Sequence, residues 1–207
     1  MPATWQVDPE HPDPRTVDRA VDVLRRGGVV AYPTDTLYGL AIDPRNADAV
    51  RRLFALKGRR PDAALPLIAA DLAQAELTGR LDAAARRLAA RWWPGPLTIV
   101  IPASAAIHRD ALAGGATVAV RVPAHAVARE LARAHGFPIG ATSANPSGTP
   151  ALSSADDVTR ALPDVDAILD AGPAPGGAPS TIVELGDRGP RLIRAGAVPW
   201  ERVLESL

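Results

Sequence analysis

The chain has 207 residues, of which 47% are hydrophobic and only 4% aromatic, so it can build a sizeable core mainly from Ala, Val, Leu and Ile. Its 23 basic and 23 acidic residues balance, which argues against non-specific coating of nucleic acid, because such binding needs a basic excess. The chain has no cysteine, no apolar run near the roughly 20 residues that span a bilayer, and no signal-like start, so we expect a cytoplasmic protein without disulfides or thiol chemistry.

Predicted helices and strands alternate along the chain without internal repeats. Asp13-Pro14 and Asn46 are typical helix starts, and the glycines at 27, 28 and 58 are typical helix ends. The expected helices cover residues 13–26, 46–57, 82–92, 124–135 and 153–162, with a last helical turn from Pro199. The expected strands cover residues 29–32, 65–70, 97–101, 117–122, 138–141, 167–170, 181–185 and 192–194. This order favours a single α/β domain over residues 1–207, with a mixed β-sheet and flanking helices.

Lys57 is the only lysine in the chain and is followed by Gly58, Arg59 and Arg60. An ammonium is a compact point charge, whereas a guanidinium is a flat fork, so a single lysine beside two arginines suits a polyphosphate. An ordinary surface lysine is the alternative, and this segment alone does not separate the two.

Three hydroxyl side chains follow the first strand, at Thr34, Thr36 and Tyr38. If this segment is extended, residues two apart share a face, which places the hydroxyls on one side and Leu37 on the other. The alternative is ordinary strand propensity, although Pro, Asp and Gly in the segment are unusual for a plain strand.

The strand over 117–122 alternates cleanly. Its valines at 118, 120 and 122 are expected to face the core, while Thr117 and Arg121 share the other face, about 13 Å apart. That separation suits a ligand with a carboxylate at one end and a phosphate or sugar at the other. The alternative is a solvent-facing arginine on a half-exposed sheet.

The loop over 142–148 carries only small polar side chains and can offer backbone N–H groups to an anion, although a simple turn would look the same. The Gly- and Pro-rich stretch 173–179 is interpreted as a flexible loop beside the site. The four histidines lack metal-ligand spacing and are expected at the surface or at helix caps, and no protein-bound metal is predicted. No nucleophile motif is present, so the residues favour positioning and charge stabilisation.

In order along the chain, these segments resemble the YrdC/TsaC family of L-threonylcarbamoyladenylate synthases. The matching segments are residues 33–40, 57–59, 93–98, 120–123, 142–148, 179–183 and 192–196, within a core of about 14–206. The resemblance implies one α/β domain with a twisted sheet and an open, positively lined cavity, in the short single-domain form. It also implies the reaction, in which L-threonine, bicarbonate or CO2, and ATP with Mg2+ give threonylcarbamoyl-AMP and pyrophosphate. The product serves a tRNA modification, so tRNA and a threonylcarbamoyl-transferase complex are implied partners.

The resemblance also implies roles for individual residues. Lys57 and Arg59 are expected to stabilise the phosphates during catalysis. Residues expected to contact threonine are Thr36, Arg121 and Ser180, with Thr34 from the same hydroxyl-bearing segment. Residues expected around the nucleotide are Lys57, Arg59, Thr117, Ser143, Asn145 and Arg194. Both Lys57 and Arg121 are expected to be exposed in the cavity.

One stretch departs from the family. Residues 63–70 lack the Asn and His of many relatives, so those contacts are not carried over. Two alternative functions remain: an RNA-binding module of the same fold without synthase activity, and a carbamoyl-adenylate enzyme like the related domain of hydrogenase-maturation proteins. The balanced charge counts against the first, and the lack of cysteine and short length count against the whole of the second.

Overall fold

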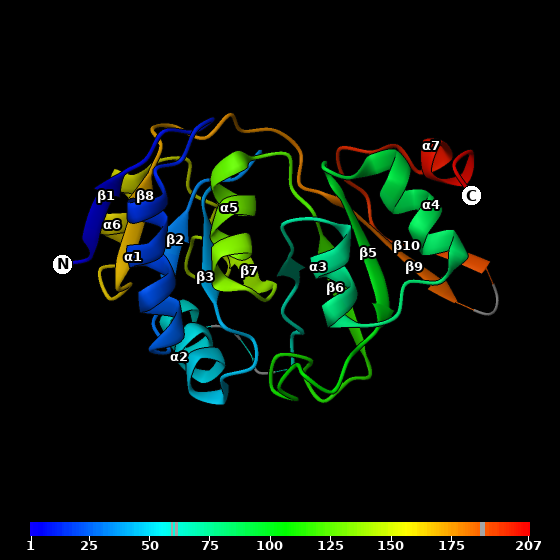
Figure 1. Ribbon diagram of the computed structural model, residues 1–207, viewed down its shortest axis with the longest axis horizontal. Helices are drawn as coiled ribbons and strands as arrows, with labels where there is room; N and C mark the ends of the chain where they lie inside the picture. The colour runs from blue at the N-terminus through cyan, green and yellow to red at the C-terminus, as the bar shows by residue number, and fades with distance from the viewer. Residues whose placement is uncertain (59, 61, 187–188) are drawn as a thin grey trace.

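The computed structural model describes residues 1–58, 60, 62–186 and 189–207 (Figure 1). The helices are α1 (Pro14–Arg25), α2 (Ala47–Lys57), α3 (Leu72–Ala75), α4 (Ala83–Trp92), α5 (Ala126–His135), α6 (Ala155–Ala161) and α7 (Trp200–Leu204), with a short 3₁₀ helix at Glu76–Thr78. None of the helices within these ranges is long and apolar enough to cross a membrane.

Local capping chemistry sets where the helices begin and end. The side chains of Asp13, Asn46 and Ser154 accept hydrogen bonds from backbone N–H groups in the first turns of α1, α2 and α6. Gly58 and Gly136 end α2 and α5 in the left-handed conformation that glycine adopts without strain. The predicted helix starts are confirmed for this reason.

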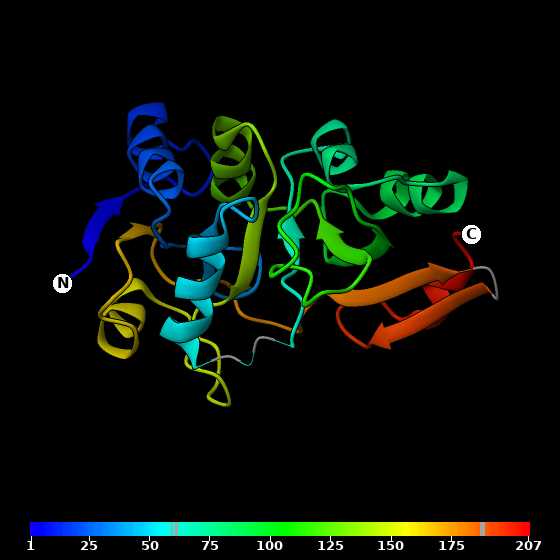
Figure 2. The same cartoon turned by 90° about the horizontal axis from the view of Figure 1, so that it is seen from below.

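The strands form one mixed sheet in the order β1-β8-β2-β3-β7-β4-β6-β5-β9-β10. They are β1 (Ala3–Gln6), β2 (Val30–Tyr32), β3 (Gly39–Ile42), β4 (Leu67–Ile68), β5 (Leu97–Pro102), β6 (Thr117–Arg121), β7 (Ile139–Ser143), β8 (Ala167–Asp170), β9 (Thr181–Gly186) and β10 (Gly189–Arg194). The two chain ends lie at opposite ends of the long axis in both ribbon views (Figures 1 and 2). The predicted α/β class with a mixed sheet is confirmed.

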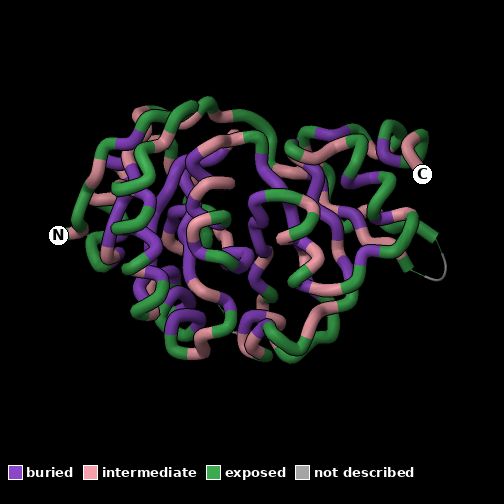
Figure 3. Tube along the Cα trace, viewed as in Figure 1, coloured by how far each residue is buried: buried purple, intermediate pink, exposed green. Residues whose placement is uncertain are grey.

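Alternation along the strands divides the core into two clusters. In β2, Val30 and Tyr32 pack in one cluster with the apolar sides of α1 and α5, while Ala31 belongs to the other. The second cluster takes Leu40 and Ile42 of β3 together with side chains of α2, α4 and α6. Figure 2 shows α1 and α5 on one side of the sheet and α2 and α6 on the other. Buried chain therefore runs through the middle of the molecule (Figure 3).

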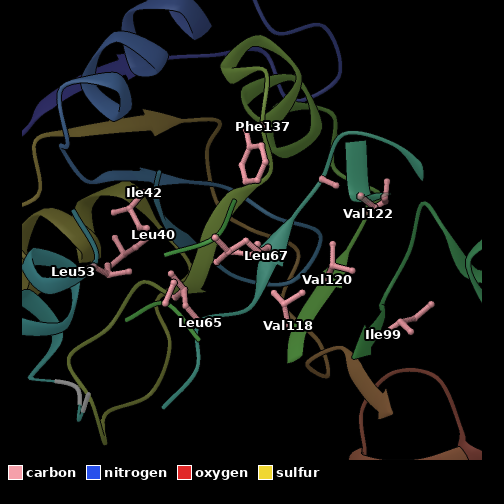
Figure 4. Packing of buried hydrophobic residues seen from close by; sticks show 14 of the residues in the cluster. Leu40, Ile42, Leu53, Leu65, Leu67, Ile99, Val118, Val120, Val122 and Phe137 are labelled. Carbon is pink, nitrogen blue, oxygen red and sulfur yellow. The ribbon is translucent and has the colours of Figure 1, made fainter. Parts of the chain in front are cut away.

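The valines of β6 lie where the sequence predicts. Val118, Val120 and Val122 are at most 2% exposed and belong to the second cluster, next to Leu67 and Ile99 (Figure 4). Burying each of these side chains contributes about 1.5–3 kcal/mol. Such a core holds the strands in place. The side chains on the opposite face of the same strands, such as Arg121, therefore have defined positions.

Four elements were not expected from the sequence: β1, β3, α3 and the 3₁₀ helix. The strand β3 is Gly39–Ile42, which begins with a glycine and lacks a polar alternation because all four residues are buried. The strand predicted over 65–70 is confirmed at Leu67–Ile68, the two residues that pair in register with β6 and β7. Whether such a short segment forms a strand depends on the strands beside it more than on its own sequence.

Candidate active site

A cleft of about 650 Å³ lies over the sheet and is lined by segments from distant parts of the sequence. Residues paired across neighbouring strands share a face, and the registers pair Tyr32 with Gly39 and Gly39 with Ser143. They also pair Ile68 with Arg121. All five of these residues line the cleft. The lining residues are Tyr32, Thr34, Thr36, Leu37, Tyr38, Gly39, Ala64, Pro66, Leu67, Ile68, Thr98, Arg121, Ala141, Thr142, Ser143, Ala151, Gly177, Pro179, Ser180, Ile182 and Arg194.

The segment between β2 and β3 is a turn rather than an extended strand. The Thr34 hydroxyl donates to the Leu37 carbonyl at 2.6 Å and accepts from the backbone N–H groups of Thr36 and Leu37. A threonine hydroxyl can form such local hydrogen bonds with nearby backbone groups, which then stabilise a turn instead of pairing in a β-ladder. Thr34 is consequently buried and holds the turn, while Thr36 stays partly exposed in the cleft.

The expectation of three hydroxyls on one side holds for Thr34 and Thr36, whose hydroxyl oxygens lie 3.2 Å apart, and is wrong for Tyr38. The Tyr38 hydroxyl turns to the end of β8, where it donates to the Gly172 carbonyl at 2.8 Å and lies 3.3 Å from the Asp170 carboxylate. Burial, with Asp170 nearby, raises the pKa of Tyr38 to about 12. Leu37, expected on the opposite side, lines the cleft.

Arg121, at the end of β6, is paired with a carboxylate that sequence reasoning missed. Its two Nη atoms lie 3.2 and 3.1 Å from the two carboxylate oxygens of Asp35, and the two side chains are only 10% and 16% exposed. The Ala124 N–H also donates to Asp35 at 3.4 Å. Arg121 lines the cleft as expected, but it is buried rather than exposed. A two-point guanidinium–carboxylate pair is the geometry in which arginine also binds a carboxylate ligand.

A second cationic group faces the cleft from β10. The Arg194 guanidinium donates to the Ser180 carbonyl at 2.8 Å and to the Ser180 hydroxyl at 3.0 Å. That hydroxyl lies 2.8 Å from the hydroxyl of Thr98, on β5. Partial burial, and then the positive charge of Arg121, lower the pKa of Arg194. Arg194 therefore adds a second guanidinium to the cleft beside the Arg121–Asp35 pair, which favours the binding of an anion there.

Lys57 is buried beneath the cleft rather than exposed in it. Only 4% of the residue is accessible, and its ammonium donates to the Ser143 carbonyl, to the Asn145 carbonyl at 2.7 Å and to the Asn145 side-chain oxygen at 3.2 Å. Carbonyl and amide oxygens such as these are the acceptors that the N–H donors of an ammonium require when it is buried. The expected exposure of Lys57 is therefore wrong, because α2 ends directly below the end of β7.

The other residues expected to contact the nucleotide do not all line the cleft. Asn145 is also buried, and its amide donates to the carbonyls of Pro146 and Thr149. Thr117 is exposed at the start of β6 and is not among the residues that line the cleft. Ser143 is exposed in the cleft. Arg59 lies outside the described residues.

The Gly- and Pro-rich stretch 173–179 lies beside the site, as expected. The Gly176 N–H donates to the Thr36 carbonyl at 2.7 Å, which ties this stretch to the turn between β2 and β3. Gly177 and Pro179 line the cleft. The two loops, residues 33–38 and 173–179, are therefore joined to each other beside the cleft.

The histidines include one that is not at the surface. His135, at the end of α5, is 5% exposed, and its Nε2 lies 3.4 Å from the Asp43 carboxylate. Arg45 also binds that carboxylate, at 2.8 Å. Within the described ranges, no group of three or more His, Asp or Glu side chains could hold a metal ion.

The model of the Sua5/YciO/YrdC family, described as telomere recombination, matches residues 22–196. The chain belongs to this family. Curated relatives named threonylcarbamoyl-AMP synthase include those of Bacillus subtilis, 40% identical over 194 residues, and Pyrococcus abyssi, 39% identical over 186 residues. These matches cover 92% and 89% of the chain but 56% and 55% of the relatives, so the chain spans about half of their length. A relative of Chromohalobacter salexigens is 43% identical over 82% of the chain and 94% of its own length.

Solved structures of Sua5/YciO/YrdC proteins share the fold. The crystal structure of P. abyssi Sua5 complexed with L-threonine matches with a TM-score of 0.92 at 36% identity, covering 99% of this chain and 60% of that one. Escherichia coli YciO matches with a TM-score of 0.88 at 26% identity, covering 98% of this chain and 100% of that one. The sequence-based resemblance to the YrdC/TsaC family is confirmed, and with it the YrdC-like fold.

Proposed function

We propose that this protein is an L-threonylcarbamoyladenylate synthase, a nucleotidyltransferase. L-Threonine and bicarbonate or CO2 form a carbamate, whose oxygen attacks the α-phosphorus of MgATP, and pyrophosphate leaves. The observation that carries this proposal is the convergence of Arg121, Ser180 and Arg194 on one cleft in a chain closely similar to named synthases. Mg2+ is treated as part of the ATP substrate.

The amino-acid end of the cleft is assigned to Arg121. A threonine carboxylate has the same chemistry as the Asp35 carboxylate that Arg121 now binds, so binding requires sharing or exchange of that partner. Thr36 and Ser180, which also line the cleft, supply hydroxyls for the amino acid. Thr34 supports this end through the turn that it holds.

The nucleotide end is assigned to Arg194 and Ser143, which are both exposed to the cleft. One opposite charge at about 4 Å contributes on the order of 4 kcal/mol near a surface before desolvation, so a triphosphate needs several such contacts. Arg59 is a further candidate from the sequence. Lys57 and Asn145 act from below by fixing the backbone of residues 143–145, and the Lys57 charge adds to the positive potential there. Thr117 stays a sequence-based candidate outside the cleft lining.

The arrangement suits catalysis by alignment and charge stabilisation. Attack of a carbamate on phosphorus needs two bound reactants in line more than a strong protein base, and positioning of this kind lowers barriers by several kcal/mol. Cationic groups around the phosphates stabilise the charge that develops on the leaving pyrophosphate. No general base is assigned.

The test is pyrophosphate release with ATP and Mg2+, with L-threonine and bicarbonate each omitted in turn. We expect release only when both are present, and threonylcarbamoyl-AMP as the product. Release with carbamoyl phosphate in place of threonine would instead identify a carbamoyl-adenylate enzyme. Salt-sensitive RNA binding with no release would identify an RNA-binding module. The product would feed tRNA threonylcarbamoylation through a transferase complex, and the cytoplasm holds all of these substrates.

A further inference from the structure

Tyr32 ends β2 and places its side chain in the floor of the cleft. The residue is 0% exposed. Its hydroxyl has no hydrogen-bond partner anywhere in the described part of the chain. Buried polar groups are nearly always paired, and an unpaired one costs about 1–3 kcal/mol. Phenylalanine would fill the same space without that cost, so the hydroxyl requires an explanation outside the apo fold.

The surroundings of this hydroxyl point to a ligand. Across the ladder from Tyr32 is Gly39, and a Cβ there would come within 3.2–3.3 Å of the ring and hydroxyl of Tyr32. The phenol edge therefore packs against the bare backbone of Gly39. The charged pair on the same side is Arg121 with Asp35, and both charges act on the Tyr32 hydroxyl.

The protonation state of this group is fixed. Burial raises the pKa of Tyr32 far above its ordinary value, with Arg121 opposing the shift and Asp35 adding to it. The phenol is therefore neutral at any working pH and acts as a hydrogen-bond donor. A neutral donor beside a guanidinium matches an anionic oxygen acceptor.

We infer that Tyr32 is a substrate-binding residue whose hydroxyl donates to the carboxylate of the amino acid held at Arg121. When that carboxylate exchanges with Asp35, one of its oxygens takes the donor that no described protein group uses. This inference rests on the proposed function, because it takes the amino acid as the ligand of the Arg121 end.

The test compares Tyr32→Phe with the wild type, and Tyr38→Phe serves as a matched stability control because these are the only two tyrosines in the chain. Thermal melting is measured for all three proteins. Tyr32→Phe should melt at the wild-type temperature or slightly above it, because an unpaired hydroxyl is removed. Tyr38→Phe should melt a few degrees lower, because its hydroxyl donates to the Gly172 carbonyl. A clear drop for Tyr32→Phe would show an internal partner and overturn the inference.

Binding is then measured by calorimetry, with L-threonine and, separately, a non-hydrolysable ATP analogue. Tyr32→Phe should raise the Kd for L-threonine about tenfold and leave the Kd for the analogue within twofold, as expected for a lost bond to a charged acceptor. An unchanged Kd for L-threonine, or a loss confined to the nucleotide, would overturn the inference. If the wild type itself binds no L-threonine, the proposed function fails first, so the two failures are distinguishable.

Discussion

Replacing Lys57 by methionine tests whether this residue acts on the fold or on the nucleotide. Methionine keeps most of the buried stem and removes the three donors that reach Ser143 and Asn145. Each buried acceptor left without a donor costs about 1–3 kcal/mol, partly offset because no ammonium has to be desolvated. We expect a net loss of about 3–5 kcal/mol, which in a domain of this size lowers the Tm by roughly 6–20 °C.

The assay is thermal melting together with calorimetric binding of an ATP analogue. Arg60→Ala is the matched control, because Arg60 lies three residues further along, its side chain is 84% exposed, and its pair with Asp62 is a surface contact. The control should melt within about 2 °C of the wild type. If Lys57→Met also melts there but loses the nucleotide, the lysine contacts phosphate directly and the structural role assigned to it is refuted.

Three further predictions concern the charged groups. Arg121→Lys keeps the charge but loses the two-point geometry, so the KM for L-threonine should rise at least about tenfold in the pyrophosphate assay; an unchanged KM would remove Arg121 from the amino-acid site. Arg194→Gln should weaken ATP-analogue binding and its salt dependence, whereas Arg191→Gln, in the same strand but paired with Glu184, should change neither; equal losses would indicate a general charge effect. Burial acts to raise the pKa of Asp43, but the nearby His135 and the hydrogen bonds from Arg45 outweigh it and hold that pKa below its ordinary value, so the stability from this carboxylate is complete above about pH 4 and is lost as the pH falls further. Urea unfolding between pH 6 and pH 2 should therefore show a smaller acid loss for Asp43→Asn, and identical slopes would contradict this.

The helices could be predicted because their signals are local. Asp13 and Asn46 satisfy N–H groups two or three residues away, so the sequence alone contains both partners. The strand β3 could not be predicted in this way, because its neighbours β2 and β7 come from residues 30–32 and 139–143. Burial on both faces removes the alternation that marks a half-exposed strand.

For the candidate site, the sequence was a better guide to which residues line the cleft than to how those residues are placed and paired. Arg121, Ser180 and Arg194 line one cleft, as the order of motifs indicates. The charge of Lys57 is visible in the sequence, but its acceptors at Ser143 and Asn145 are not, since they lie 86 and 88 residues later in the chain. The Asp35 partner of Arg121 was missed for a related reason: an extended segment places it on the opposite face from Thr34, whereas a turn does not.

The ten-stranded sheet under the cleft limits how the protein can move. Among the described residues, neighbouring strands from β2 to β10 are joined by ladder hydrogen bonds, which hold the two halves of this floor together. Under the proposed function, enclosure of the reactive intermediate then depends on residues 33–38 and 173–179, two loops that are joined by the hydrogen bond from the Gly176 N–H to the Thr36 carbonyl. Under the proposed function, these two loops limit the access of water to the intermediate, above cleft-lining groups that the strand ladder holds in register.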